Sequence, residues 1–235
     1  MASPFFIILT EDPSRERQHR IGSSNGCLAV KIMAHIIGLT GPIGAGKSTA
    51  AAFFQKNEVP IVDADGISRS LTAEGGLGST AVARVFGDDY LTPTGAMDRT
   101  KMRERVFRDP AALKTLEAIL HPLIGEAVDE AFAGLCASPF VVYDCPLLYR
   151  SNFRRAALSE ILVIDASDAV RLKRILTRPG LTPDTAKRMM ATQPPRRAYV
   201  DIADLVIVNE GTEDDLHTRL AAHYDLRKTF RNELR

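Results

Sequence analysis

The feature that most restricts the fold of this chain is a glycine-rich segment at residues 41–48, Gly-Pro-Ile-Gly-Ala-Gly-Lys-Ser. It matches the pattern G-x-x-x-x-G-K-[ST], in which glycines let the backbone curl so that successive N–H groups point at phosphate oxygens. An apolar run precedes it at residues 36–40, and helix-forming residues follow at 48–55. The order strand, glycine loop, helix predicts a phosphate-binding loop; a glycine-rich turn that matches by accident is the alternative.

Two side chains of this loop have the chemistry that a nucleotide site needs. Lys47 can reach the β- and γ-phosphates, and the Ser48 hydroxyl can ligate Mg²⁺. The helix that starts near Lys47 adds its positively polarised N-terminal end. We therefore predict that ATP and Mg²⁺ bind here, with Ser48 as the metal ligand. The predicted nucleotide-binding residues of the loop are Gly41, Pro42, Ile43, Gly44, Ala45, Gly46, Lys47, Ser48 and Thr49.

Four further apolar runs each end in a carboxylate or an amide. They are residues 61–62 before Asp63, 140–143 before Asp144, 161–164 before Asp165, and 205–208 before Asn209. Apolar runs that are continuous rather than alternating are typical of strands covered on both faces, hence of a parallel sheet. Polar residues at the carboxyl ends of such strands mark the functional edge of the sheet. The predicted fold class is α/β, a P-loop NTPase with three α/β/α layers and a five-stranded parallel sheet.

Two carboxylates, Asp63 and Asp65, follow the second predicted strand. If the backbone is extended there, side chains two positions apart point the same way. One could accept the proton of an attacking hydroxyl while the other binds Mg²⁺ through water or orients a partner. Which of the two is the base stays open, and a cap for the following helix is the alternative. Asp144, at the end of the third strand, has the position of a Walker-B carboxylate, with a similar alternative.

The segment between the second and third strands is longer than one crossover helix requires. Helices are predicted at residues 99–108, 111–120 and 125–135, with breaks at Pro110 and Pro122. We therefore predict a helical substrate-binding lobe at about residues 66–136.

A second pair of helices is predicted at residues 170–177 and 183–192, the latter capped by Thr182 or another nearby residue. Together with the loop at Pro179-Gly180 they indicate a basic lid at about residues 177–197. The planar guanidinium of arginine can hold two phosphate oxygens, and Arg178, beside the loop, is the predicted phosphate contact. The arginines of this region, for each of which a solvated surface position is the alternative, are Arg174, Arg178, Arg188, Arg196 and Arg197.

Composition limits the remaining functions. The 235 residues include 30 Lys and Arg against 29 Asp and Glu, which argues against a nucleic-acid or anionic-membrane surface. The three cysteines (Cys27, Cys136, Cys145) have no metal-ligand or redox spacing. The apolar run at residues 5–9 is too short to span a membrane. We expect a cytoplasmic monomer with a poorly ordered leader at residues 1–33, followed by a P-loop kinase domain at 34–235.

Together these motifs resemble the dephospho-CoA kinase family, from about residue 36 to the C-terminal helix. The P-loop alone would indicate only a superfamily, whereas the ordered series is specific. The matching positions are residues 38–48, Val-Asp-Ala-Asp at 62–65, Arg69, Leu-His-Pro-Leu-Ile at 120–124, Asp-x-Pro-Leu-Leu at 144–148, Arg178, Gln193, Ala203-Asp204 and Asn209. The resemblance implies transfer of the ATP γ-phosphate to the ribose 3′-hydroxyl of dephospho-CoA, the last step of coenzyme A synthesis.

The resemblance also implies a role for individual residues. Asp65 would be the general base, Arg178 the lid residue that meets the ATP phosphates, and Asn209 a nucleotide contact. The fold implied is a P-loop core with a helical CoA-binding lobe and a lid, as in nucleoside monophosphate kinases. For His121, a helix cap or a satisfied buried histidine is the alternative. The implied acceptor-side residues are Asp63, Asp65, Arg69, His121, Asp144, Pro146 and Leu147.

The chain departs from the family pattern at three places. Gly125 stands where a basic residue is usual, Tyr149-Arg150 replaces Phe-Glu, and Tyr199 replaces a lysine. These positions surround the expected acceptor site and lid. The resemblance therefore says less about how the acceptor binds than about how ATP binds. The alternatives to this activity are a P-loop kinase for another small molecule, and a binding protein that keeps the nucleotide site without turnover. Intact Lys47, Ser48 and Asp65 favour an enzyme.

Overall fold

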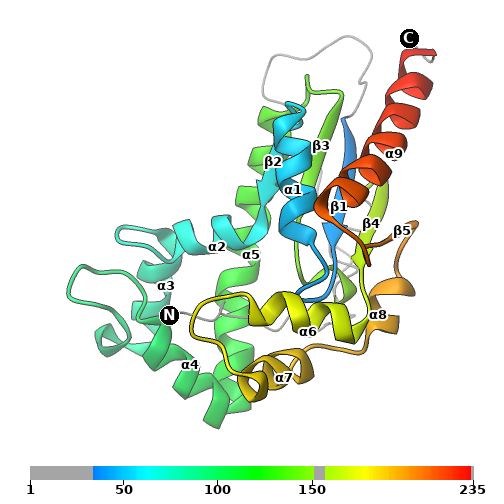
Figure 1. Cartoon of the computed structure of the whole chain (residues 1–235). Coiled ribbons are helices and arrows are strands. Elements are labelled where there is room, and N and C mark those ends of the chain that lie inside the picture. The colour runs from blue at the N-terminus through cyan, green and yellow to red at the C-terminus, as the bar shows by residue number, and fades with distance from the viewer. Residues whose placement is uncertain (1–33, 151–156, 234–235) are drawn as a thin grey trace. The chain divides into compact units, whose positions relative to one another are not determined.

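The computed structural model describes residues 34–150 and 157–233 (Figure 1). The predicted leader at residues 1–33 lies outside the described residues. The described chain forms two compact units. The sheet unit consists of Ala34–Val62 and the residues from Ser138 onward, and the helical unit consists of Asp63–Ala137.

A five-stranded sheet forms the centre of the sheet unit. The strands lie in the order β2 (Ile61–Asp63), β3 (Phe140–Asp144), β1 (His35–Thr40), β4 (Glu160–Asp165) and β5 (Leu205–Val208). β1 pairs in parallel with both β3 and β4, and β4 pairs in parallel with β5. All five predicted strands are present, and β2, β3, β4 and β5 each end at or just before the predicted polar residue. The predicted α/β class with a five-stranded parallel sheet is confirmed.

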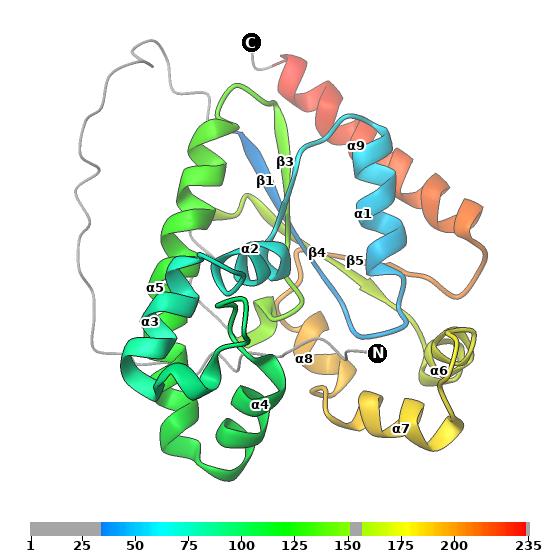
Figure 2. The ribbon, with the colours of Figure 1, turned by 90° about the vertical axis from the view of Figure 1, so that its left-hand side faces the viewer.

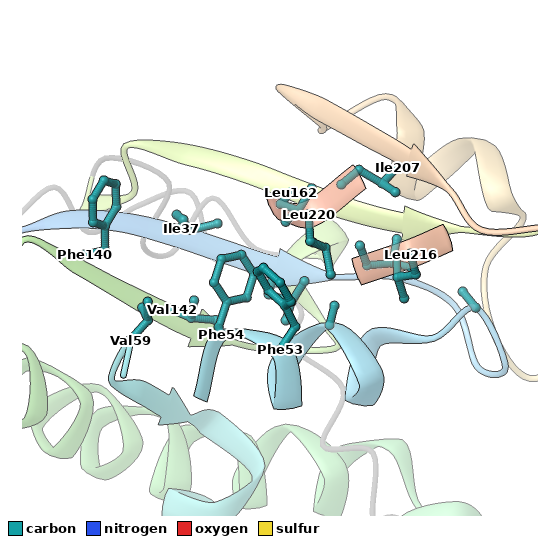
Figure 3. Close-up of a cluster of buried hydrophobic side chains, with 14 of the residues drawn as sticks. Ile37, Phe53, Phe54, Val59, Phe140, Val142, Leu162, Ile207, Leu216 and Leu220 are labelled. Carbon is teal, nitrogen blue, oxygen red and sulfur yellow. The ribbon is translucent and has the colours of Figure 1, made fainter. Parts of the chain in front are cut away.

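Two helices, α1 (Lys47–Lys56) and α9 (Glu213–Glu233), cover one face of this sheet (Figures 1 and 2). Phe54 of α1 and Leu220 of α9 are fully buried against strand residues such as Ile37 (Figure 3). Burying a side chain of this size contributes about 1.5–3 kcal/mol relative to exposure. This packing fixes the start of α1, and with it the loop that joins β1 to α1.

The opposite face of β1 is packed by other residues of the sheet unit. Gly38 leaves room there for the side chains of Leu148 and Leu158, since a Cβ at Gly38 would lie only 2.7 Å from the Leu158 Cδ1. Leu148 belongs to the short 3₁₀ helix η2 (Leu148–Arg150). The continuous apolar strands are therefore explained by burial on both faces.

Three shorter helices complete the sheet unit: α6 (Asp168–Leu176), α7 (Pro183–Ala191) and α8 (Arg196–Val200). The first two are the predicted helical pair, and the Thr182 hydroxyl caps α7 by accepting a hydrogen bond from Thr185 N (3.2 Å). The prediction did not include α8, whose five residues are too few for a periodic signal.

The helical unit contains α2 (Ala64–Leu71), α3 (Leu77–Phe86), the 3₁₀ helix η1 (Asp88–Tyr90), α4 (Arg99–Arg108) and α5 (Pro110–Gly134). α5 contacts α2, α3 and α4. The centre of the unit is a small apolar cluster of buried residues, namely Val82, Met97, Met102, Leu116 and Leu120.

The predicted break at Pro122 is wrong, because α5 runs without interruption from Pro110 to Gly134. A proline inside a helix removes one backbone N–H and crowds the carbonyl four residues earlier, here that of Ala118. Leu120 and Val128, on either side of Pro122, are fully buried. Their burial offsets the local cost and keeps both halves of the helix in place.

Pro110 does separate two helices, as predicted, because it occupies the first turn of α5. The Asp109 carboxylate accepts hydrogen bonds from Ala111 N (2.9 Å) and Ala112 N (3.2 Å), which caps the helix. Among the helices of residues 34–150 and 157–233, none combines the length and the apolar character that crossing a membrane requires.

Candidate active site

The phosphate loop joins β1 to α1 and is packed closely from behind. Gly44 and Gly46 have φ angles of +80° and +108°, a region that side chains rarely adopt. A Cβ at Gly44 would lie 2.7 Å from the backbone oxygen of Arg171 on α6, and one at Gly46 would collide with the Asn209 side chain. Glycine is therefore required at both positions by the backbone conformation and by the neighbouring atoms.

Asn209, at the end of β5, holds the loop at Ala45. Its side-chain nitrogen Nδ2 donates to Ala45 O (2.8 Å), and its Oδ1 accepts from Arg174 Nη2 (3.2 Å). Arg174 also donates through Nη1 to Ala45 O (3.3 Å) and to Asn209 O (2.9 Å). Both groups of the Asn209 amide are thus engaged in supporting the loop. A direct contact of Asn209 with the nucleotide stays a prediction.

Lys47 and Asp144 meet at the carboxyl edge of the sheet, where Lys47 Nζ forms an ion pair with Asp144 Oδ1. Asp144 lies opposite Leu39 in the parallel register of β1 and β3, which brings it beside the loop. Ser48, the next residue of α1, is exposed. A lysine, a carboxylate and an accessible hydroxyl therefore lie together at the start of α1.

Pro146 and Leu147 lie just after β3 in the sheet unit. The Thr40 hydroxyl, at the end of β1, donates to Pro146 O (3.3 Å), and Leu147 is buried. These contacts fix the chain just beyond Asp144. Their predicted role in acceptor binding stays a prediction.

The arginines of the predicted lid have different surroundings. Arg196 binds Asp165, at the end of β4, through Nε (2.9 Å) and Nη2 (2.6 Å), and this hydrogen bonding raises the pKa of Arg196 above its ordinary value. Arg188 and Arg197 are exposed. Arg178 is exposed in the loop between α6 and α7, and within residues 34–150 and 157–233 its guanidinium has no hydrogen-bond or ion-pair partner. It is accessible to a ligand.

In the helical unit, the Asp63 carboxylate accepts a hydrogen bond from Arg69 Nη2 (2.9 Å) and makes no capping hydrogen bond to α2. The helix-cap alternative therefore does not hold for Asp63. Arg99, the first residue of α4, donates through Nη2 to the Thr72 hydroxyl (2.6 Å). Burial and then the repulsion of Arg69 lower the pKa of Arg99, while Asp65 acts in the opposite direction. These acidic and basic residues form one electrostatic cluster.

The amino-acid sequence of this chain is similar to those of a known protein family. Residues 35–215 match the family model described as dephospho-CoA kinase.

The chain belongs to the dephospho-CoA kinase family.

Curated relatives agree with this assignment. A dephospho-CoA kinase of Bordetella parapertussis is 42% identical over 191 residues, covering 80% of this chain and 89% of the relative. One of Dechloromonas aromatica is 39% identical over 187 residues, covering 80% and 90%. Among solved structures, TT1252 from Thermus thermophilus has a TM-score of 0.70 and 30% identity, covering 83% of this chain and 98% of its own. A dephospho-CoA kinase from Campylobacter jejuni, at 22% identity and a TM-score of 0.57, shares the fold.

His121, which the resemblance to dephospho-CoA kinases assigns to the acceptor side, lies in the middle of α5 and is therefore not a helix cap. Its Nε2 is buried and, within the described part of the chain, has no hydrogen-bond partner. Burial lowers the pKa of His121. The satisfied-histidine alternative thus fails for Nε2.

Two of the departures from the dephospho-CoA kinase pattern contact each other. The rings of Tyr149 and Tyr199 have centroids 4.8 Å apart in an edge-to-face arrangement, and Tyr199 is 1% exposed. Such an aromatic pair is a packing contact within the sheet unit. The third departure, Gly125, is buried on α5.

The sequence did not indicate the roles of Arg171 and Arg99. Arg171 lies behind the phosphate loop, with a side chain 5% exposed, and its Nε donates to Ile43 O (2.9 Å). No local signal distinguishes it from a surface arginine on a helix. Arg99 did carry a signal, because a basic residue in the first turn opposes the helix dipole and indicates another reason for its presence.

We expect Gly44→Ala to weaken ATP binding at least about tenfold, because strain at a positive φ of roughly 1–2 kcal/mol adds to the clash with Arg171. Isothermal titration calorimetry would measure the change. Gly134→Ala is the matched control, since Gly134 has open space around it. A folded Gly44→Ala protein that binds ATP like the original chain would contradict this account of the loop.

We expect His121 to make stability depend on pH. Folding lowers the pKa of His121, so this histidine binds a proton more tightly in the unfolded chain, where its pKa has the ordinary value of about 6.5, than in the folded chain. The free energy of unfolding should therefore fall as the pH drops from 7.5 to 5, and it should fall less in His121→Asn. Urea unfolding at both pH values measures this difference; equal losses in the two proteins would disprove it.

Proposed function

We propose that this chain transfers the γ-phosphoryl group of ATP to the ribose 3′-hydroxyl of dephospho-CoA. The observation that carries the proposal is the phosphate loop, whose Lys47 forms an ion pair with Asp144. The chain that contains this loop matches the dephospho-CoA kinase family over residues 35–215. Phosphoryl transfer needs little covalent chemistry from the protein, and depends on positioning and on neutralising the phosphate charge. The site is built for these two tasks.

On the ATP side, the loop backbone and the N-terminal end of α1 bind the phosphates. Lys47 exchanges its contact with Asp144 for the β- and γ-phosphates, which are the stronger anionic partner. Arg178 approaches from the exposed loop between α6 and α7 and stabilises the transferring group with its planar guanidinium. Closure of this lid excludes water, which would otherwise hydrolyse ATP.

Ser48 and Asp144 fit a magnesium ion, because Mg²⁺ prefers oxygen ligands and both groups lie beside the loop. Ser48 would hold the ion directly, and Asp144 would hold it once released from Lys47. When bound, Mg²⁺ would neutralise part of the negative charge of the ATP phosphates.

On the acceptor side, Asp65 accepts the proton of the 3′-hydroxyl, and the helical unit binds the rest of the acceptor. Asp63, the other candidate base, forms an ion pair with Arg69 (2.9 Å). Arg69 and Arg99 supply positive charge for an anionic acceptor, and His121 supplies a neutral polar atom. We also propose a cytoplasmic monomer that acts on a small molecule. The net charge of +1 argues against nucleic acid or an anionic membrane as a partner.

The experiment that tests the function is a coupled assay of ADP release with ATP and Mg²⁺, run with dephospho-CoA and with a panel of nucleosides and sugars. We expect stimulation by dephospho-CoA alone, with the product mass of the 3′-phosphorylated coenzyme. Stimulation by another acceptor would keep a kinase and reject this substrate. ATP binding without turnover on any acceptor would indicate a binding protein.

If Asp65 is the base, Asp65→Asn should lower kcat by about 10²-fold or more while ATP still binds. Asp63→Asn is the matched control, because it removes the same charge two residues away and only breaks the ion pair with Arg69. Initial rates and calorimetric ATP affinity would be compared for both variants. A larger loss of kcat in Asp63→Asn would assign the base to Asp63.

A further inference from the structure

Gln193 belongs to the family motifs and is not among the residues proposed to contact ATP or the acceptor. It follows Thr192, the C-cap of α7, and precedes Pro194-Pro195. Its side-chain oxygen Oε1 accepts a hydrogen bond from Ile43 N in the phosphate loop (2.8 Å). The same oxygen accepts from Arg171 Nη2 (3.3 Å). One amide oxygen therefore joins the end of α7 to both the loop and α6.

Arg171 completes this connection from α6. Its Nε donates to Ile43 O (2.9 Å) and its Nη1 donates to Asp168 Oδ1 (2.9 Å). All three nitrogens of the guanidinium are thus engaged, and the side chain is 5% exposed. The N–H and the C=O of Ile43 are held by two side chains, one just beyond α7 (Gln193) and one on α6 (Arg171).

The contacts of Arg171 and Gln193 with Ile43 restrict movement of the α6–α7 hairpin. We use this name for α6, α7 and the loop at residues 177–182. Arg171 lies one turn into α6, and Gln193 lies just beyond α7, so both ends of the hairpin are attached to Ile43. Arg178 is in the connecting loop, away from these attachments. A hairpin movement must either carry the peptide groups of Ile43 with it or break hydrogen bonds of a buried arginine, which is unfavourable.

Ile43 directly precedes Gly44, whose position is limited by the backbone of Arg171. A shift of α6 is therefore transmitted to the loop twice, through the side chain of Arg171 and through its backbone. The loop geometry and the hairpin position are mechanically linked within the sheet unit.

We propose that Gln193 and Arg171 are positioning residues that couple the α6–α7 hairpin to the phosphate loop, so that nucleotide phosphates on the loop set the hairpin in its closed position. The inference deepens the proposed kinase activity. Uncoupling should leave ATP binding largely in place and should let water reach the bound nucleotide, because closure no longer follows binding.

Gln193→Met is the informative variant, since it keeps the length of the side chain and removes the oxygen. Gln193→Glu keeps an acceptor for Ile43 N and a partner for Arg171, and should behave like the original chain in hairpin closure. Gln55→Met, on the exposed side of α1, is the matched control. Because Arg171 is buried, Arg171→Met could fail to fold, and the test does not depend on it.

The first measurement is hydrogen–deuterium exchange with and without a non-hydrolysable ATP analogue, which needs no acceptor. In the original chain, Gln193→Glu and Gln55→Met, the analogue should protect amides of both residues 41–49 and residues 177–182. In Gln193→Met it should protect the loop only. Protection of both segments in Gln193→Met would overturn the coupling, and the result is independent of which acceptor the enzyme uses.

The second measurement is the ratio of ATP hydrolysis to phosphoryl transfer with dephospho-CoA. We expect this ratio to rise about tenfold or more in Gln193→Met and to stay unchanged in the two other variants. A merely structural role would reduce the amount of active enzyme and lower both rates together, leaving the ratio constant, which would overturn the proposal. If the original chain transfers nothing to dephospho-CoA, the proposed acceptor fails, while the exchange experiment still tests the coupling.

Discussion

The tight packing behind the phosphate loop is the constraint on which the rest of the site depends. Gly44 and Gly46 have backbone angles and neighbours that exclude a side chain. Ala45 O is held by Asn209 and Arg174, and Ile43 is held by Gln193 and Arg171. Donors that are fixed before the ligand arrives need no reorganisation during the reaction, so this packing contributes directly to binding and catalysis.

Charge at the carboxyl edge of the sheet is arranged in local pairs. Asp144 on β3 pairs with Lys47, and Asp165 on β4 pairs with Arg196, on the two sides of β1. The guanidinium of Arg178, outside these pairs, is exposed and accessible to a ligand. A chain with a net charge of +1 can therefore present a cationic site without a basic surface.

Two of the residues that depart from the family pattern are explained by a contact between their side chains. Tyr149 and Tyr199 pack against each other, so the aromatic ring at one position provides the partner for the other. A tyrosine that is 1% exposed stabilises the sheet unit by burial, and it does not supply the positive charge of a lysine. Exposed arginines of the same region, Arg178, Arg188 and Arg197, do carry positive charge.

The sequence alone determined the phosphate loop, the five strands, the polar ends of four of them and the helix at residues 99–108, because these features depend on local periodicity, glycine positions and capping residues. The continuity of α5 through Pro122 was decided by tertiary burial of Leu120 and Val128. The hydrogen bonds that Arg171, Asn209 and Gln193 make to the phosphate loop were also decided only by the tertiary structure. Gln193 and Ile43 are 150 positions apart in the chain, and a hydrogen bond across that separation exists only because the parallel sheet brings its strand ends to one edge.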